Sequence, residues 1–207
     1  MLEQRSEDWY DIRRGRFTAS EITKILGVKG LGLTGKTYAI EKAIEDIFGL
    51  ESEEYRFISH DMQRGIDLEP LAVRKFEELH FDEFFNVQEA FFYPYGDHAG
   101  ASPDRLVNDD SILEIKCPRR NKFFKLVANG SNEIDQQYID QMQMQMLCTN
   151  SVRCYFFNYI IFNNKEYWHE ITIYRDEKRI ELIKERIEEA IKIKLEYIEK
   201  INNNKQF

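Results

Sequence analysis

Residues 102–118 of this 207-residue chain read SPDRLVNDDSILEIKCP, and they decide the fold. The turn-forming run NDD separates two short apolar stretches, so we predict a hairpin that brings a strand at residues 112–116 beside Asp104. Side chains alternate along a strand, which places Glu114 and Lys116 on one face and turns the intervening leucine and isoleucine toward the core.

This hairpin would gather two carboxylates and a lysine. An acid and a lysine two residues apart on a buried strand are costly unless they are used. Metal-assisted hydrolysis of a phosphodiester uses them: two carboxylates hold Mg²⁺ through hard oxygen ligands, and the lysine orients the attacking water or offsets developing negative charge. Taken alone, the short pattern fits an ordinary ion pair on a half-exposed strand equally well.

Two further stretches supply polar side chains of the right type. Glu69, in the run RGIDLEP near the start of a predicted helix, could add a third carboxylate; the alternative is an acid that the helix dipole favours at an N-terminus. Gln141 and Gln143 lie on a helix after the lysine strand. Neutral amides there could position water or phosphate, or they could form a polar helix face.

Two basic clusters flank this centre in the sequence. Residues 9–20, WYDIRRGRFTAS, mix Arg13 and Arg16 with aromatic rings and hydroxyls ahead of a helix start, a combination suited to a phosphate pocket. Arg119 and Arg120 follow the lysine strand and precede two phenylalanines. Both clusters fit contacts to a nucleic-acid backbone, although each residue by itself also fits solvated surface charge.

Composition limits the class of protein. A length of 207 residues with 43% hydrophobic residues predicts a single folded domain over residues 1–207. A net charge of −8 excludes a generally basic surface, so any contact with nucleic acid must come from a local patch. Three cysteines without ligand spacing argue against a zinc site, a disulfide framework or an iron–sulfur cluster. No apolar targeting or membrane-spanning run is found, so we expect a soluble cytoplasmic protein with no membrane association.

The remaining pattern predicts alternating helices and strands without a repeat or linker. Helical spacing and capping predict helices at residues 20–26, 37–48, 67–79, 133–147 and 176–201. β-Branched and aromatic runs predict strands at residues 90–95, 112–116, 154–162 and 167–174. The stripe that marks the last helix is Ile180, Ile183, Ile187, Ile191, Leu195 and Ile198. We therefore predict an α/β fold, with a mixed central sheet flanked by helices and a long C-terminal helix.

Residues 30–37, GLGLTGKT, match the phosphate-binding loop pattern GxxxxGK[ST]. A true loop of this kind follows a buried strand, whereas residues 21–26 are interrupted by polar side chains and resemble a helix. We interpret the segment as a flexible loop leading into a helix. ATPase activity stays as a rival function.

Six motifs along the chain occur in the order in which a known nuclease family carries them. They are W-x3-R…TASE (Trp9, Arg13, residues 18–21), RGxxxE (Arg64, Gly65, Glu69), SPD (residues 102–104), LEIKCP (residues 113–118), YxxQxQ (Tyr138, Gln141, Gln143) and RDEK (residues 175–178). The chain thereby resembles the phage lambda exonuclease and YqaJ-type viral recombinase family, of the PD-(D/E)xK nuclease superfamily. The resemblance implies a restriction-endonuclease-like core.

The resemblance also implies an activity and its metal. The expected enzyme is a 5′→3′ exonuclease that degrades one strand of linear double-stranded DNA from a 5′-phosphorylated end, releasing mononucleotides and leaving a 3′ overhang. One or two Mg²⁺ ions, with Mn²⁺ as an alternative, would be held by Glu69, Asp104, Glu114 and the carbonyl of Ile115. In this two-metal hypothesis one ion activates water, the other stabilises the leaving oxygen near Glu69, and Lys116 acts on the nucleophilic water.

The remaining expected site residues handle DNA. Gln141 would assist the lysine, Arg13 would hold the 5′-phosphate, and Ser20 and Ser102 would lie near the scissile strand. The further expected DNA contacts are Arg16, Arg119, Arg120 and Gln143.

The resemblance further implies a phage or prophage origin, a bacterial or phage-infected cell and a single-strand-annealing recombinase as partner. Relatives can form a ring-shaped trimer around DNA, but the apolar stripe of the last helix fits packing within one subunit equally well. The sequence departs from the family at Arg105, where a glycine often follows SPD, and Arg13, Arg14 and Arg16 compete for the phosphate role. The rival functions are an endonuclease or nickase with the same metal core and a non-catalytic DNA-end-binding module.

Overall fold

The structure is a computed structural model that describes residues 6–49, 59–81 and 85–204. Its helices are α1 (Glu7–Arg13), α2 (Gly32–Phe48), α3 (His60–Leu79), α4 (Arg120–Asn129), α5 (Gln136–Thr149) and α6 (Glu177–Asn203), with 3₁₀ segments η1 (Ala19–Ile25) and η3 (Gly130–Glu133). Its strands are β1 (Phe17–Thr18), β2 (Val87–Glu89), β3 (Tyr93–Tyr95), β4 (Ala99–Ala101), β5 (Arg105–Val107), β6 (Ser111–Lys116), β7 (Arg153–Phe162) and β8 (Lys165–Tyr174).

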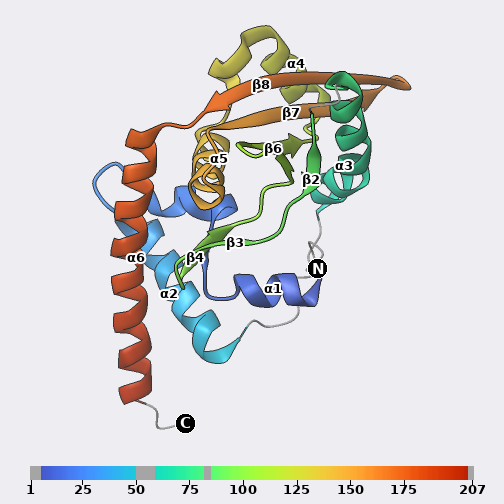
Figure 1. Cartoon of the computed structure of the whole chain (residues 1–207). Coiled ribbons are helices and arrows are strands. Elements are labelled where there is room, and N and C mark those ends of the chain that lie inside the picture. Colours follow the sequence, from blue (N-terminus) through green and yellow to red (C-terminus); the bar gives the residue numbers. More distant parts are fainter. Residues whose placement is uncertain (1–5, 50–58, 82–84, 205–207) are drawn as a thin grey trace.

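The larger sheet has five strands in the order β2-β5-β6-β7-β8 (Figure 1). The central pair β6 and β7 is parallel, and the other neighbouring pairs are antiparallel. A parallel pair needs a crossover connection, which α4, η3 and α5 provide. Different helices cover the two faces: α3 packs on one through Phe76 against Leu113 and Phe157, and α5 packs on the other through Met142 and Met146.

Strand β6 is buried on both faces. Leu113 and Ile115 face the core, as predicted, and lie in the cluster beneath α3. The opposite face is buried as well: Ile112 packs on the α5 side, and Glu114 is only 2% exposed. The prediction of a single core face for this strand is therefore too narrow. Central strands of a sheet covered by helices have no solvated face. A carboxylate in this position needs polar partners.

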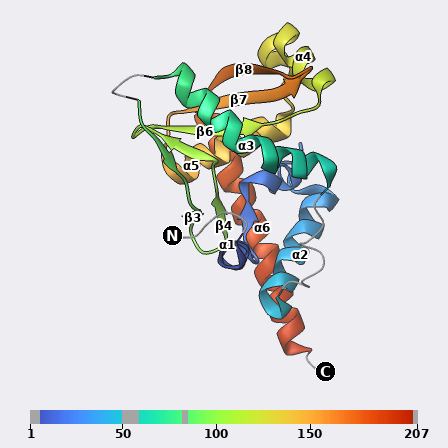
Figure 2. The ribbon, with the colours of Figure 1, turned by 90° about the vertical axis from the view of Figure 1, so that its right-hand side faces the viewer.

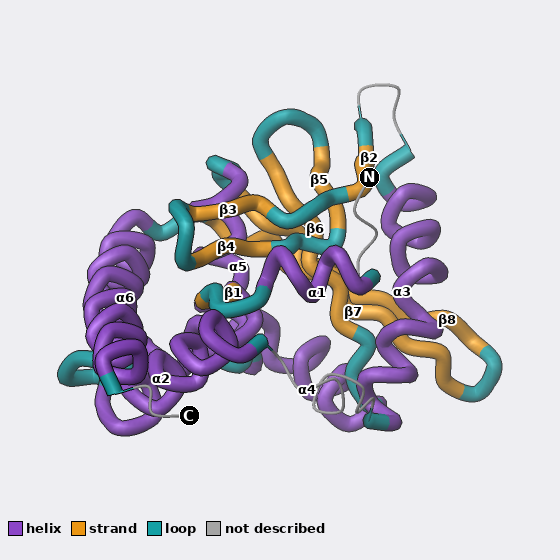
Figure 3. The backbone as a smooth tube through the Cα atoms, turned by 90° about the horizontal axis from the view of Figure 1, so that it is seen from below, coloured by secondary structure: helices purple, strands orange, loops and turns teal. Residues whose placement is uncertain are grey.

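A second layer lies on the other side of α5. Strands β1, β4 and β3 form a small sheet in that order, with β1 parallel to β4. Phe17, Ile22, Tyr38 and Ile183 bring this sheet, η1, α2 and α6 into one apolar cluster. Helices α2 and α6 lie side by side (Figure 2), and α1 lies between them and α3 (Figure 3).

The predicted α/β class, mixed sheet and long C-terminal helix are confirmed. The strands predicted at residues 112–116, 154–162 and 167–174 are β6, β7 and β8. The strand predicted at residues 90–95 is wrong in its first half, because only Tyr93–Tyr95 pairs, with β4. The sequence reading missed α1 and α4. Among the helices of the described ranges, none is both long and apolar enough to cross a membrane.

Residues 30–37 do not adopt the phosphate-binding loop. Helix α2 begins at Gly32, so most of the pattern is already helical, and the predicted loop is shorter than expected. The segment before it is the 3₁₀ turn η1 rather than a buried strand. Residues 19–37 thus lack the strand–loop–helix context that the pattern requires, which removes the structural basis for an ATPase.

Candidate active site

A cleft of about 650 Å³ opens where α1, α3 and α5 meet the end of β6. Most of the residues expected from the sequence line it. They are Arg13, Ser20, Glu69, Ser102, Asp104, Glu114, Ile115, Lys116, Arg119 and Gln141. Parts of the sequence that lie far from one another, around residues 13–20, 64–69, 102–119 and 141, therefore contribute to one cavity.

The predicted hairpin places Asp104 beside β6. Strand β5 pairs antiparallel with β6, and Asn108 in the turn takes the left-handed conformation with φ of 52°. The backbone N–H of Asp104 donates to the Leu113 carbonyl at 3.2 Å, and Oδ2 of Asp104 accepts the Ile115 N–H at 2.6 Å. These two bonds hold the Asp104 carboxylate against the end of the strand that carries Glu114.

Three side chains donate hydrogen bonds to the buried carboxylate of Glu114. Oε1 accepts from Lys116 Nζ at 2.6 Å and from Gln141 Nε2 at 2.7 Å, and Oε2 accepts from Gln145 Nε2 at 2.6 Å. Lys116 also lies 4.8 Å from the ring centre of Tyr138. The packing of α5 against β6 thus holds Glu114, Lys116 and the two glutamines in one hydrogen-bonded group.

Glu69 enters the same cleft from α3. Its Oε1 lies 3.7 Å from Nη1 of Arg105, and the same Nη1 donates to the Asp104 carbonyl at 2.5 Å. Arg105 is the residue that stands where a glycine often follows the SPD motif. The arginine therefore bridges the carboxylate of α3 and the backbone of Asp104.

The carboxylates shift the ionisation of their neighbours. Burial, followed by the charges of Glu114 and Glu69, raises the pKa of Asp104 well above its usual value. Burial lowers the pKa of Lys116, but the charges of Glu114 and Asp104 outweigh that effect and raise it overall. Burial and then the charges of Asp104 and Glu69 raise the pKa of Cys117 to about 12. The site therefore concentrates negative charge, and Lys116 is its protonated counter-charge.

A second group of side chains lines the cleft beside the carboxylates. Arg13 donates from Nη1 to Ser102 Oγ and from Nη2 to Ser20 Oγ, each at 3.4 Å. Its guanidinium lies 4.0 Å from the ring centre of Trp9, whose Nε1 donates to Ser102 Oγ at 3.3 Å. An arginine fork stacked on an indole beside two hydroxyls is suited to binding a phosphate group.

Other expected DNA contacts lie elsewhere. Arg16 donates to the Gly96 carbonyl, and Arg120 stacks near Phe162 on a separate surface; neither lines the cleft. Gln143 is buried away from the cleft, where it donates to the Tyr174 carbonyl and accepts the Asp176 N–H. Arg119 does line the cleft, paired with Asp61.

Gln145 is a site residue that the sequence reading missed. It is fully buried, and besides Glu114 its Nε2 approaches the Ser102 carbonyl at 3.4 Å. Residues four apart share a helix face, so Gln145 follows Gln141 on the side of α5 that faces β6. The four-residue spacing from Gln141 was the feature of the sequence that could have identified Gln145.

The chemistry of the donor set fits a hard divalent cation. Glu69, Asp104 and Glu114 bring carboxylate oxygens, the ligands that hard divalent cations prefer, into one cleft. The pKa of Asp104 is raised first by burial and then by the charges of Glu114 and Glu69, and a bound cation would offset that negative charge. Among the described residues no three acidic, histidine or cysteine side chains are arranged as a ready-made metal site. Lys116, Gln141 and Gln145 engage both oxygens of Glu114, so an ion would compete with Lys116 for this carboxylate.

Comparison with known proteins identifies the family. The family described as "YqaJ-like viral recombinase domain" matches residues 8–151. An alkaline exonuclease from Laribacter hongkongensis, LHK-Exo, shares 28% identity over 96% of this chain and 97% of its own, with a TM-score of 0.81. The structure of LHK-Exo in complex with dAMP gives 27% identity, the same coverage and a TM-score of 0.82.

A phage related exonuclease from Haemophilus somnus 129PT covers 91% of this chain and 96% of its own at 19% identity, with a TM-score of 0.68, which shows the shared fold. None of the curated proteins matches this sequence at a significant level. The restriction-endonuclease-like fold predicted from the motifs is confirmed. The chain belongs to the YqaJ-like viral recombinase family.

Proposed function

We propose that the protein is a metal-dependent 5′→3′ exonuclease that removes mononucleotides from a 5′-phosphorylated end of linear double-stranded DNA. The observation that carries the proposal is the position of Ser102. It accepts a hydrogen bond from Arg13 and lies two residues before Asp104. A terminal phosphate held at Arg13 would leave the adjacent phosphodiester near the carboxylates, so that cutting is confined to the end of a strand.

The relatives support this proposal. LHK-Exo is named as an alkaline exonuclease and was solved with dAMP, a nucleoside monophosphate of the kind that an exonuclease releases. A 3′ overhang left by such an enzyme is the substrate that a single-strand-annealing recombinase requires. We therefore include such a protein as the proposed partner.

Each side chain has a defined part in hydrolysis. Glu69, Asp104, Glu114 and the Ile115 carbonyl would hold Mg²⁺ or Mn²⁺, which when bound supplies Lewis-acid activation of water and of the phosphate. Lys116 stays protonated despite its burial, because the charges of Glu114 and Asp104 raise its pKa, and it would place positive charge where negative charge develops on the phosphate. Gln141 donates to Glu114 and lies 3.5 Å from Lys116 through Oε1, so it orients both groups.

The exonuclease is distinguished from an endonuclease by DNA topology. In Mg²⁺, linear duplex should be degraded while a covalently closed circle of the same sequence stays intact, and chelator should stop the reaction. Cutting of the closed circle at a similar rate would instead favour the endonuclease or nickase that shares this metal core. Binding of DNA ends without any cleavage would favour the end-binding module.

Arg13→Ala is expected to reduce the preference for a 5′-phosphate. Charge-assisted hydrogen bonds contribute about 1.5–3 kcal/mol, so the ratio of kcat/KM for phosphorylated over hydroxyl ends should fall about 10- to 100-fold. Arg16→Ala is the matched control, because Arg16 contacts the Gly96 carbonyl outside the cleft. Equal effects of the two substitutions would contradict the assignment of Arg13.

Gln145→Met is expected to weaken metal binding, because Glu114 loses the donor that holds its Oε2. Residues that orient metal ligands contribute about 10- to 100-fold in metal affinity, so the Mg²⁺ concentration for half-maximal cleavage should rise by about 10-fold or more. Gln143→Met, a change at a buried glutamine of the same helix, should lower stability without shifting the Mg²⁺ titration. A shift common to both variants would argue against a specific role of Gln145.

A further inference from the structure

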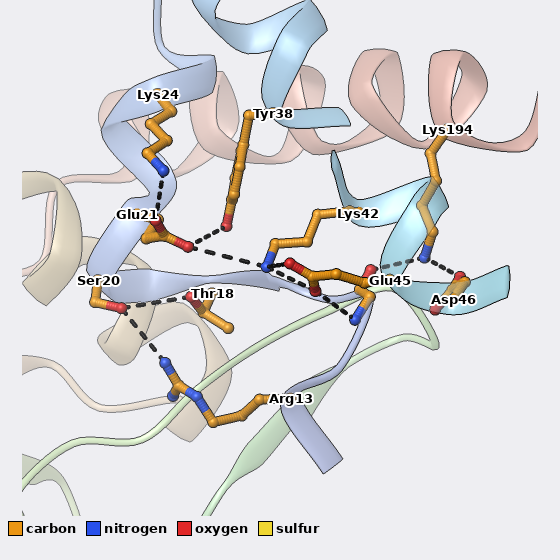
Figure 4. Close-up of polar contacts among 11 residues, drawn as sticks. Arg13, Thr18, Ser20, Glu21, Lys24, Tyr38, Lys42, Glu45, Asp46 and Lys194 are labelled. Atoms are coloured by element: carbon orange, nitrogen blue, oxygen red, sulfur yellow. Dashed lines mark hydrogen bonds and ion pairs between the residues drawn. The ribbon is translucent and has the colours of Figure 1, made fainter. Parts of the chain in front are cut away.

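The segment from Arg13 to Ser20 carries two side chains of the phosphate pocket, and Gly15 lies within it. Both backbone polar groups of Gly15 are held by charged side chains from other helices (Figure 4). Its N–H donates to Oε2 of Glu45 on α2 at 2.9 Å, and its carbonyl accepts from Nζ of Lys194 on α6 at 2.7 Å. The backbone that follows Arg13 is therefore fixed from two sides.

Each of the two side chains that hold Gly15 belongs to an ion pair that contains a buried lysine. Lys42 is 5% exposed and donates to the Glu45 oxygens at 2.8 and 2.9 Å. Lys194 is 1% exposed; its Nζ lies 2.6 Å from Oδ2 of Asp46 and 3.2 Å from Nδ1 of His98. Buried ammonium groups are retained only with such partners, and removal of one partner is strongly destabilising.

The same network reaches the other end of the segment. Nζ of Lys42 lies 4.0 Å from Oε2 of Glu21, the residue after Ser20, and this Oε2 accepts the Tyr38 hydroxyl at 3.1 Å. Figure 4 shows the two lysines entering from α2 and α6 on one side of the segment, with Arg13 and Ser20 on the other. The Ser20 end of the segment is therefore linked to α2, the same helix that holds the Gly15 N–H.

Gly15 is required by this arrangement. Its φ is +67°, and a Cβ at this position would lie 1.7 Å from Oδ1 of Asp46. A side chain at this position would therefore displace the Asp46 carboxylate that pairs with Lys194, and the positive φ also favours glycine.

We propose that the pairs Lys42–Glu45 and Lys194–Asp46 are positioning residues for 5′-phosphate recognition: by clamping Gly15 they set the direction of the Arg13 fork toward Ser20 and Ser102. The inference rests on the proposed function. Arg13 contacts its two serines at 3.4 Å and stacks on the Trp9 ring, and the backbone that follows it is held at Gly15, so the position of that backbone decides where the guanidinium group can reach. The four clamp residues, Lys42, Glu45, Asp46 and Lys194, lie on α2 and α6, and none of them lines the cleft.

The test compares the unmodified protein with Lys194→Met, using duplexes that differ only in a 5′-phosphate or 5′-hydroxyl. Because misplacement of a binding group by about 1 Å costs up to about 100-fold, the kcat/KM ratio for phosphorylated over hydroxyl ends should fall about 10-fold or more. Cleavage of the hydroxyl-ended duplex should stay near its original rate. Equilibrium binding of the two duplexes in chelator should lose the same preference, which gives a readout independent of catalysis.

Two further variants keep the test decisive. Glu45→Ala removes the acceptor of the Gly15 N–H and should act like Lys194→Met even if the latter folds poorly. Lys75→Met is the matched control, because Lys75 also forms ion pairs, but with Glu78 on α3 and Glu166 on β8, and contacts none of the four clamp residues through them. It should leave the phosphate preference unchanged.

The outcomes separate the inference from the proposed function. An unmodified protein without any preference for a 5′-phosphate would overturn the proposed function and the clamp with it. A preference that is lost in Arg13→Ala but kept in Lys194→Met and Glu45→Ala would overturn the clamp alone. An equal loss in Lys75→Met would assign the effect to general destabilisation and would also overturn the clamp.

Discussion

Asp104→Asn should abolish DNA cleavage in Mg²⁺ while raising the thermal stability of the metal-free protein. A carboxylate that binds the catalytic ion supports several kcal/mol of transition-state stabilisation, so the rate should fall by at least about 10³-fold. Asparagine keeps an oxygen that can accept the Ile115 N–H, now 2.6 Å from Oδ2 of Asp104, so the hairpin should survive. Single-turnover cleavage of a linear duplex measures the first effect.

The gain in stability follows from the direction of the pKa shift. The folded pKa of Asp104 is raised, first by burial and then by Glu114 and Glu69. Its favourable contribution is therefore complete below the unfolded value of about 3.9 and is lost as the pH rises through the folded pKa. In chelator at neutral pH, Asp104→Asn should melt at a higher temperature than the unmodified protein, and the difference should shrink toward pH 4.

Asp61→Asn provides the matched control. Asp61 lines the same cleft but is exposed and pairs with Arg64 and Arg119. This change should leave cleavage largely intact and should not raise stability. A variant at Asp104 that still cleaves, or one that melts lower in chelator, would contradict the proposed metal centre.

Lys116→Met should lower kcat by about 10²- to 10³-fold, the usual effect of removing a donor that stabilises transition-state charge. The same change should leave Mg²⁺ affinity unchanged or increase it, because Lys116 no longer competes for Oε1 of Glu114. Gln141 and Gln145 still hold that carboxylate. Kinetics at saturating Mg²⁺ together with a calorimetric Mg²⁺ titration in the absence of DNA would measure both quantities.

Lys122→Met tests whether the effect is specific. Lys122 lies in the same cleft and, like Lys116, is 4.8 Å from the Tyr138 ring centre, but it pairs with Asp135 rather than Glu114. Its loss should alter KM for DNA more than kcat. If Lys116→Met reduced Mg²⁺ affinity and kcat in parallel, the lysine would be a structural support of the metal site rather than a group that acts in the reaction.

The hairpin that carries Asp104 and Glu114 could be predicted from sequence because its determinants are local. Asp104 and Glu114 are joined by one turn, and strand alternation fixes which side chains share a face. The pairing of Asp104 with β6 needed only this short-range information. Periodicity could not show that Glu69 and Arg13 lie near Asp104 and Glu114, because α3 and α1 meet β6 only in the tertiary structure. The family resemblance, which rests on the order of the motifs, provided that expectation.

Helix α5 shows where a motif reading fails. Gln141 and Gln143 are two residues apart, and on a helix such residues face different directions. Gln141 meets Glu114, whereas Gln143 bonds the backbone between β8 and α6. Gln145 is the residue that shares the face of Gln141.

Two other elements show the limits of apolar patterning. The stripe of α6 predicts burial of Leu195, yet Leu195 is 46% exposed and Lys194 is 1% exposed. Lysine is buried there because Asp46 and the Gly15 carbonyl receive its ammonium group, partners that only the folded chain brings together. Helix α1 was missed because none of its residues is buried, so it has no apolar periodicity to detect.

The most direct test of the central claim uses linear duplex DNA labelled at one 5′-phosphate, with an otherwise identical hydroxyl-ended duplex and a closed circle as substrates. Metal-dependent 5′→3′ exonuclease activity predicts that the first labelled product in Mg²⁺ is a mononucleotide, with slower attack on the hydroxyl end, none on the circle and none in chelator. Labelled oligonucleotides as first products, or breakage of the circle, would contradict the exonuclease while keeping the metal centre. Absence of cleavage in both Mg²⁺ and Mn²⁺ would contradict the catalytic role of Asp104, Glu114 and Lys116 altogether.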